Sequence, residues 1–251
     1  MTRFVGLIAG FAIATVALAA CGGNDETEPA SPTAPASPTV AVTPPSEERS
    51  AAEALLKVIA LPVEDLPEGF TLVDEGFTTN EEVAGGEEDA QPGALTVEEL
   101  DRLGRILGYE TVYSRDAPSG TLLLLLTTDL YRDPAGAGEQ FEFLRQQPSD
   151  PELLEALQQQ VPGTGLEVQA ATISLLSLAE VGDDRLAFEV KSTVRIPDLN
   201  TDVDQFARFV EIRRARGIGS IMAVAVGSPT PLEELEDLAG KLDERLKEAL
   251  E

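Results

Sequence analysis

The chain has 251 residues with 45 acidic and 18 basic side chains, and its formal charge at neutral pH is −27. This charge repels the phosphates of nucleic acids and of anionic lipid head groups, so we expect neither as a ligand. The chain has no histidine and a single cysteine, Cys21, which excludes Ser-His-Asp and Cys-His catalysis and zinc sites of imidazole and thiolate ligands. Carboxylates, oxygen-ligated metals, a Ser/Lys pair or a tyrosine remain as catalytic groups.

The N-terminal segment has the three-part layout of an export signal. Arg3 supplies a positive charge, residues 4–18 form an uncharged apolar run, and small residues follow at Ala19 and Ala20. The run is shorter than the ~20 residues that a membrane-spanning helix needs. We therefore predict a signal peptide over residues 1–20 and expect the rest of the chain outside the cytoplasm. An uncleaved N-terminal anchor and a soluble secreted product are the alternatives.

The tetrapeptide Leu18-Ala19-Ala20-Cys21 resembles the lipobox of bacterial lipoproteins. The resemblance implies cleavage before Cys21, a diacylglycerol on its thiol, and a mature protein anchored to the outer face of the cell membrane. Two acyl chains, at ~0.8 kcal/mol per buried CH₂, anchor a protein stably without a membrane helix. With this thiol acylated, the mature chain has none left for a disulfide.

Residues 21–50 are predicted to be a disordered tether. The stretch from Pro29 to Pro45 consists of Pro, Ser, Thr, Ala and Val and has too little apolar side chain to fold. Its prolines favour extended polyproline II conformation, which would hold the folded part away from the membrane. Its Ser-Pro and Thr-Pro sequences are also possible acceptors for O-linked glycans.

A single domain is expected over residues 51–251, because this length can bury one hydrophobic core. The elements expected in its first half are a helix over 47–60 capped by Ser46, a strand over 70–73, an exposed acidic loop over 81–93, a helix that starts at the capping box Thr96-Val97-Glu98-Glu99 and carries Leu100, Leu103 and Leu107, and a hairpin of strands over 109–114 and 121–131. Leucine at successive positions of the last strand predicts that both faces of the sheet are covered.

The second half is expected to continue with helices and strands in alternating groups. The expected elements are a helix over 134–147, a short helix carrying Leu153, Leu154 and Leu157, strands over 166–178 and 186–196, a hairpin over 205–225 with its turn near 215–217, and a helix that starts at Thr230-Pro231-Leu232-Glu233 with Thr230 as its cap. Because short turns join most neighbouring strands, we predict an α+β fold with a mainly antiparallel sheet and helices packed on it.

Two groups of charged residues are candidate binding sites. Asp198, Asn200, Asp202 and Asp204 have the alternate spacing that opens a calcium loop, although Val203 and Phe209 stand where such loops have Gly and Glu. A solvated acidic loop is the alternative. Arg213, Arg214 and Arg216 are a dense basic cluster that could hold a carboxylate or phosphate. Arginines at a hairpin tip that pair with nearby acids are the alternative.

The layout from about residue 55 resembles LpqN-type lipoproteins and the extracellular domain of PknH-like receptor kinases. The resemblance is carried by the lipobox, the segment Asp65-Leu66-Pro67-Glu68-Gly69-Phe70, the turn Val181-Gly182-Asp183, the late hairpin and the terminal helix. It implies an α+β domain that binds something at the cell envelope, and it carries over no functional residue. The disulfides of PknH-like domains have no counterpart in this chain.

We therefore predict an extracytoplasmic lipoprotein whose domain binds an envelope ligand or protein partner, in the manner of a sensor. No cofactor is expected beyond the diacylglycerol on Cys21 and, if the acidic loop binds it, Ca²⁺. A carrier of lipid or another hydrophobic molecule, with a cavity between sheet and helices, is the alternative. A structural role in the wall and a carboxylate-dependent hydrolase are further alternatives, and the oligomeric state is left open.

Overall fold

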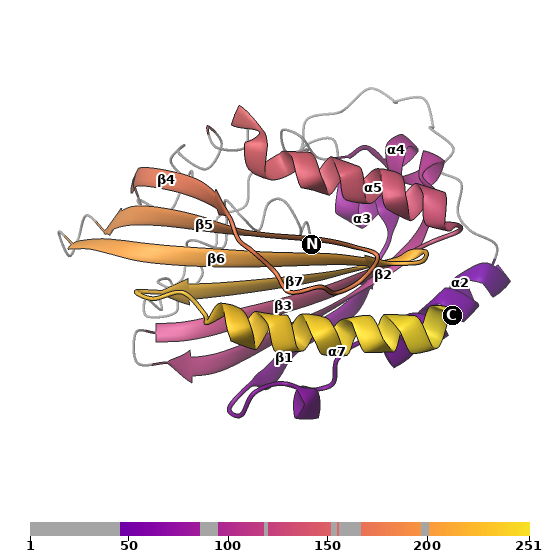
Figure 1. Cartoon of the computed structure of the whole chain (residues 1–251), viewed down its shortest axis with the longest axis horizontal. Coiled ribbons are helices and arrows are strands. Elements are labelled where there is room, and N and C mark those ends of the chain that lie inside the picture. The colour runs from indigo at the N-terminus through magenta and orange to yellow at the C-terminus, as the bar shows by residue number, and fades with distance from the viewer. Residues whose placement is uncertain (1–45, 86–94, 118–119, 152–154, 156–166, 197–200) are drawn as a thin grey trace, which may run out of the picture.

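The computed structural model describes residues 46–85, 95–117, 120–151, 155, 167–196 and 201–251 (Figure 1). Its strands are β1 (Thr71–Thr78), β2 (Arg105–Ala117), β3 (Gly120–Tyr131), β4 (Glu167–Leu175), β5 (Asp184–Ile196), β6 (Thr201–Arg214) and β7 (Gly217–Val226). The described helices are α2 (Ser46–Ile59), α3 (Asn80–Ala84), α4 (Val97–Arg102), α5 (Pro134–Gln146) and α7 (Leu232–Leu250), with 3-10 turns η1 (Val63–Asp65) and η2 (Gln147–Ser149).

All seven strands belong to one sheet in the order β1-β2-β3-β7-β6-β5-β4, and every neighbouring pair is antiparallel. The predicted α+β fold is therefore confirmed. The late hairpin is also confirmed: Arg214 pairs with Gly217, and Ala215 in the turn has a positive φ of 50°.

β3 separates two hydrophobic layers. Leu124 and Leu126 pack with side chains of α2 and α7, whereas Leu125 and Tyr131 pack with Phe141 of α5. Successive side chains of a strand point to opposite faces, so α2 and α7 cover one face of the sheet and α5 covers part of the other (Figure 1). This arrangement confirms the prediction that both faces are covered.

The terminal helix α7 packs closely on β7 through the predicted leucine stripe. Leu235, Leu238, Leu242 and Leu246 are buried, and a Cβ atom at Gly219 would lie 2.7 Å from the Cδ2 atom of Leu242. The absence of a side chain at this strand position therefore lets the helix approach the sheet.

The start of α7 differs from the prediction. Pro231, and not Thr230, occupies the N-cap position, and no side chain caps the helix. The Thr230 hydroxyl is buried without a hydrogen-bond partner, while its carbonyl oxygen accepts a bond from Arg208. Thr230 therefore binds Arg208 through its carbonyl oxygen, and its hydroxyl does not cap the helix.

The segment after β1 also differs from the prediction. β1 extends to Thr78, and the predicted acidic loop begins with α3, which a capping box of Thr79 and Glu82 starts. α4 begins as predicted with the Thr96–Glu99 capping box but ends at Arg102, since Gly104 has a φ of 74° and β2 follows at once. Leu107 therefore belongs to the sheet. The predicted helix with Leu153, Leu154 and Leu157 lies outside the described residues.

The first turn of α5 packs against the chain between α4 and β2, and two glycines of α5 test this contact. A Cβ atom at Gly136 would lie 1.9 Å from the backbone oxygen of Leu103, whereas one at Gly138 would meet no atom within 4 Å. We expect Gly136→Ala to destabilise the fold by about 1–3 kcal/mol through this clash. The matched control Gly138→Ala should stabilise it by about 0.5–1 kcal/mol through helix propensity. Urea unfolding measures both, and equal midpoints for the two variants would contradict the close contact.

Candidate functional site

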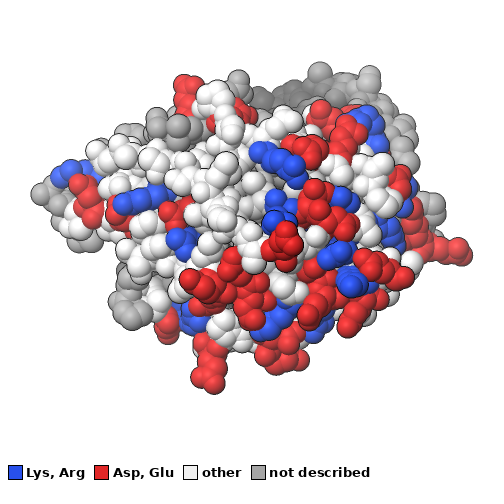
Figure 2. Space-filling view, viewed as in Figure 1, with Lys and Arg blue, Asp and Glu red and all other residues white. Residues whose placement is uncertain are grey.

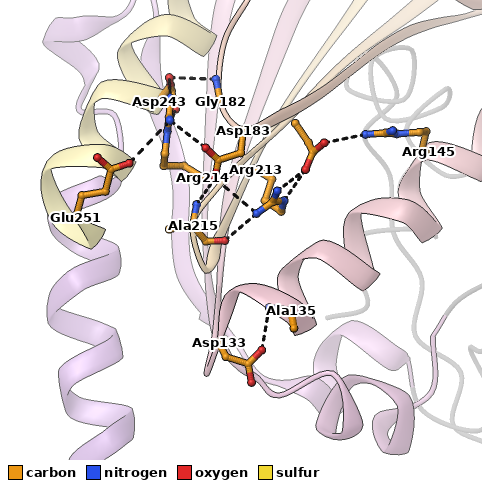
Figure 3. Close-up of polar contacts among 11 residues, drawn as sticks. Asp133, Ala135, Arg145, Gly182, Asp183, Arg213, Arg214, Ala215, Asp243 and Glu251 are labelled. Carbon is orange, nitrogen blue, oxygen red and sulfur yellow. Dashed lines mark hydrogen bonds and ion pairs between the residues drawn. The ribbon is translucent and has the colours of Figure 1, made fainter.

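The three arginines predicted to bind an anion lie at the β6–β7 turn, where three parts of the chain meet (Figure 3). Arg213 and Arg214 end β6, and Arg216 follows in the turn. The connection between β4 and β5 and the C-terminal half of α7 bring carboxylates to them.

Each of the two strand arginines already binds carboxylates of the chain. Arg214 donates from Nε and Nη2 to the two oxygens of Asp243, at 2.8 and 2.6 Å, and from Nη1 to Asp183 at 3.1 Å. Arg213 donates from Nε and Nη2 to Asp184 Oδ2, at 2.7 and 2.5 Å. The contact of Arg214 with both oxygens of Asp243 is the bidentate geometry in which arginine binds carboxylates most strongly.

The electrostatics agree with this pairing. Burial alone would raise the pKa of Asp243, but hydrogen bonds from Arg214 and from the Gly182 N–H outweigh it and hold that pKa below its ordinary value. The pKa of Asp184 is lowered in the same way, with burial opposed by Arg213 and Arg145. An external anion would have to displace these carboxylates, so the arrangement favours the alternative in which the arginines pair with nearby acids.

Arg216 has a different role in the turn. Its Nη1 donates to the backbone oxygen of Tyr131 at 3.0 Å, and its own backbone oxygen accepts the Tyr131 N–H at 3.0 Å. Arg216 thereby ties the turn to the end of β3. Anion binding by these three residues stays a prediction that no contact in the structure supports.

The residues of the predicted calcium loop fall into two groups. Asp202 and Asp204 lie in β6, where Asp202 pairs with Arg195 at 3.4 Å and Asp204 pairs with Lys191 at 2.8 Å. Asp198 and Asn200 lie outside the described residues. Among the side chains that the structure describes, no group of three or more metal-binding residues converges. Calcium binding stays a prediction.

A buried polar row lies on the α5 side of the sheet, next to the arginines. Glu110, Thr127, Ser220 and Glu211 are opposite one another on the adjacent strands β2, β3, β7 and β6. Each is at most 8% exposed, and the Thr127 hydroxyl has no hydrogen-bond partner. We call these four residues the polar row.

Glu211 is the chemically unusual member of the polar row. Its pKa is raised to about 8, because burial and the nearby charge of Asp129 raise it and the hydrogen bond from the Ser220 hydroxyl opposes the shift only in part. At neutral pH the carboxyl group is therefore protonated. A carboxylic acid with such a pKa is a possible general acid or base. Glu211 is buried, however, and within the polar row it accepts a hydrogen bond from the Ser220 hydroxyl.

Beside the polar row, Arg105 holds α3 against the sheet, and α4 is joined to α3 because Asn80 Nδ2 donates to Asp101 at 2.7 Å. The Arg105 side chain is 1% exposed, and its five N–H groups bind Asp129, the hydroxyl and carbonyl of Thr78, and the Asn80 side chain at 2.7–3.1 Å. Gly108 leaves room for this network, because a Cβ atom there would lie 2.3 Å from Arg105 and Asp129. The network explains how two short helices are fixed to β2.

Sequence reasoning missed both the polar row and the Arg105 network. A signal for Glu211 was present, since it stands between Val210 and Ile212 in an apolar strand segment.

Within the described part of the chain, none of the helices is long and apolar enough to cross a bilayer.

Comparisons with known proteins give structural neighbours only. No family model matches the chain, and no curated protein sequence matches it. The extracellular domain of PknH from Mycobacterium tuberculosis is similar with a TM-score of 0.44 and 9% identity, over 78% of this chain and 96% of that one. LpqN, involved in cell envelope biogenesis of the same organism, is similar with a TM-score of 0.29 and 13% identity, over 74% and 79% of the two chains. The resemblance predicted from the sequence is confirmed as a distant likeness.

Proposed function

We propose that this chain is a lipid-anchored extracytoplasmic protein whose α+β domain binds a ligand or a protein partner at the cell envelope. The observation that carries the proposal is the Leu18-Ala19-Ala20-Cys21 motif, which ends a positively charged and apolar N-terminal segment. A diacylated Cys21 would place the domain outside the membrane on a tether rich in proline.

The side chains of the domain support binding in preference to catalysis. Asp184 and Asp243 are held by arginines, which stabilises their charged forms and leaves them poor proton donors. Glu211 has a pKa suitable for proton transfer, but its side chain is buried and out of reach of a substrate. We therefore propose that the domain recognises a partner through its surface.

Fractionation of cells that produce the full chain tests the anchor. We expect the wild type in the membrane fraction and Cys21→Ala in the soluble fraction, because only the diacylated thiol attaches the mature chain. Mass spectrometry of the purified wild type should find Cys21 as the first residue with a diacylglycerol attached, and it would also identify any co-purifying molecule. Ser31→Ala, in the tether, is the control and should stay in the membrane fraction. A Cys21→Ala variant that stays there would support an uncleaved anchor. A co-purified lipid would favour the carrier alternative.

A further inference from the structure

The sheet ends in two edge strands, β1 and β4, and their chemistry differs. An edge strand presents unpaired N–H and C=O groups, and soluble proteins usually protect such edges with charges, prolines or β-bulges. β1 has two of these protections. The carboxylates of Asp74 and Glu75 lie within the strand, and its register with β2 shifts between Leu72 and Asp74.

β4 has such protections only at its start, where Glu167 lies and the register with β5 shifts between Val168 and Ala170. Twelve successive residues, from Val168 to Ala179, carry no charge and include no proline, in a chain of which 25% is charged. Thr172 and Ser174 are exposed, and β5 is the one described strand that pairs with β4. Figure 2 shows an uncharged area over β4, whereas acidic side chains gather over α7 and β1.

The charged residues on the neighbouring strand do not change this picture. Thr172 is opposite Lys191 and Ser174 is opposite Glu189. Lys191 pairs with Asp204 at 2.8 Å, and Glu189 pairs with Arg208 at 2.7 Å. Both charges are therefore compensated within the sheet.

Among the described strands, β4 is the last one beside the hydrophobic layer under α5. A row of apolar side chains crosses the sheet on this face and includes Met222, Phe209 and Phe188. Leu175 is opposite Phe188 and ends the row at the edge, where it is 66% exposed. One more strand beside β4 would bury this leucine and continue the row.

We infer that the β4 edge takes an extended, uncharged segment of a partner protein as an eighth strand. The backbone of β4 would supply the hydrogen bonds, and its side chains would select the sequence. An apolar residue would sit beside Leu175, and a hydroxyl or other small polar residue would sit beside Thr172 and Ser174 on the opposite face. The partner segment is thus one in which apolar and hydroxyl side chains alternate. The inference rests on the proposed function, because it names the partner class for the proposed binding.

Charge favours such a partner over a second copy of the chain. Each copy carries a formal charge of −27, so two copies would bring strongly repelling surfaces together. A charged strand would in turn have to place its charges beside the uncharged side chains of Thr172, Ser174 and Leu175, which costs free energy.

A capped peptide of alternating threonine and valine, titrated to millimolar concentration into the full chain, tests the inference. We expect backbone amide shifts confined to β4 and the residues beside it, with slower hydrogen exchange along β4. A peptide of the same length with lysine in place of threonine should bind at least about tenfold more weakly. The same loss is expected for the Thr/Val peptide with the variant Leu175→Lys.

Leu72→Lys is the matched control, because Leu72 is an exposed leucine of the other edge strand, 48% exposed. It should leave peptide binding unchanged. The absence of shifts, shifts at β1, or equal binding by Leu175→Lys would each overturn the inference. So would a dimer of the peptide-free protein in sedimentation that Leu175→Lys dissociates, since the edge would then bind a second copy. Failure here leaves the membrane anchor standing, because the Cys21 fractionation tests it separately.

Discussion

Replacing Arg105 with methionine is expected to lower the free energy of unfolding by about 3–5 kcal/mol, as removal of one partner of a buried ion pair does. Methionine keeps much of the length of the side chain but removes all five hydrogen-bond donors. Partly buried Asp129 would then lose its counter-charge, and the Thr78 carbonyl and the Asn80 side-chain oxygen would lose their donor.

Arg102→Met is the matched control for this prediction. Arg102 lies three residues away, its side chain is 59% exposed, and it pairs with exposed Glu139 at 2.7 Å. Its removal should hardly move the urea midpoint, because exposed ion pairs contribute little. If the two variants unfolded at the same urea concentration, the network would not fix α3 and α4 to the sheet. Loss of hydrogen-exchange protection confined to α3 and α4 in Arg105→Met would locate the effect.

Local patterns were sufficient to predict the architecture. The leucine run of β3 indicated a strand covered on both faces, and the stripe of α7 indicated a helix on the sheet, because both signals lie within one element. The lengths of β1 and β2 were underestimated, since polar residues such as Glu75 and Glu110 interrupt their apolar pattern. These residues are accommodated by partners that the local sequence does not show, such as the Tyr109 hydroxyl, which donates to Glu75 at 2.6 Å.

The polar contacts of the candidate site could be predicted only in part. The arginines at the hairpin tip were identified by their density in the sequence, but their partner Asp243 is 29 residues from Arg214 and reaches it only because α7 packs on β7. Arg105 and Asp129 are 24 residues apart and meet across β2 and β3. Such pairs depend on register and packing, which composition and periodicity do not specify.

The pH dependence of stability is expected to have an unusual direction, and Glu211 is the cause. Its pKa is about 8 in the folded protein, whereas that of an exposed glutamate is 4.5. Between these values the folded protein binds one proton more than the unfolded chain, so stability falls as pH rises. At 1.36 kcal/mol per pH unit, the loss from pH 4.5 to pH 8 is about 4–5 kcal/mol.

Glu211→Gln should remove this slope. Glutamine can keep the hydrogen bond with Ser220 and carries no charge at any pH, so the variant should match the wild type near pH 4.5 and exceed its stability at pH 8. Urea unfolding at several pH values measures the difference. Glu139→Gln is the control, because Arg102 lowers the pKa of exposed Glu139 and its titration therefore lies below this window. A wild type whose stability is constant from pH 5 to 8 would contradict a protonated Glu211.

At acidic pH the free energy of unfolding should change in the opposite direction, rising as pH rises. The lowered pKa values of Asp184 and Asp243 mean that their contribution to stability is present above the ordinary aspartate pKa and is lost as pH falls through the folded values. The wild type should therefore be most stable near pH 4–5, between the two effects. In Glu211→Gln only the loss at low pH should remain, and the maximum should broaden toward neutral pH. The shape of the two curves thus separates the buried acid of the polar row from the arginine-bound carboxylates at the hairpin turn.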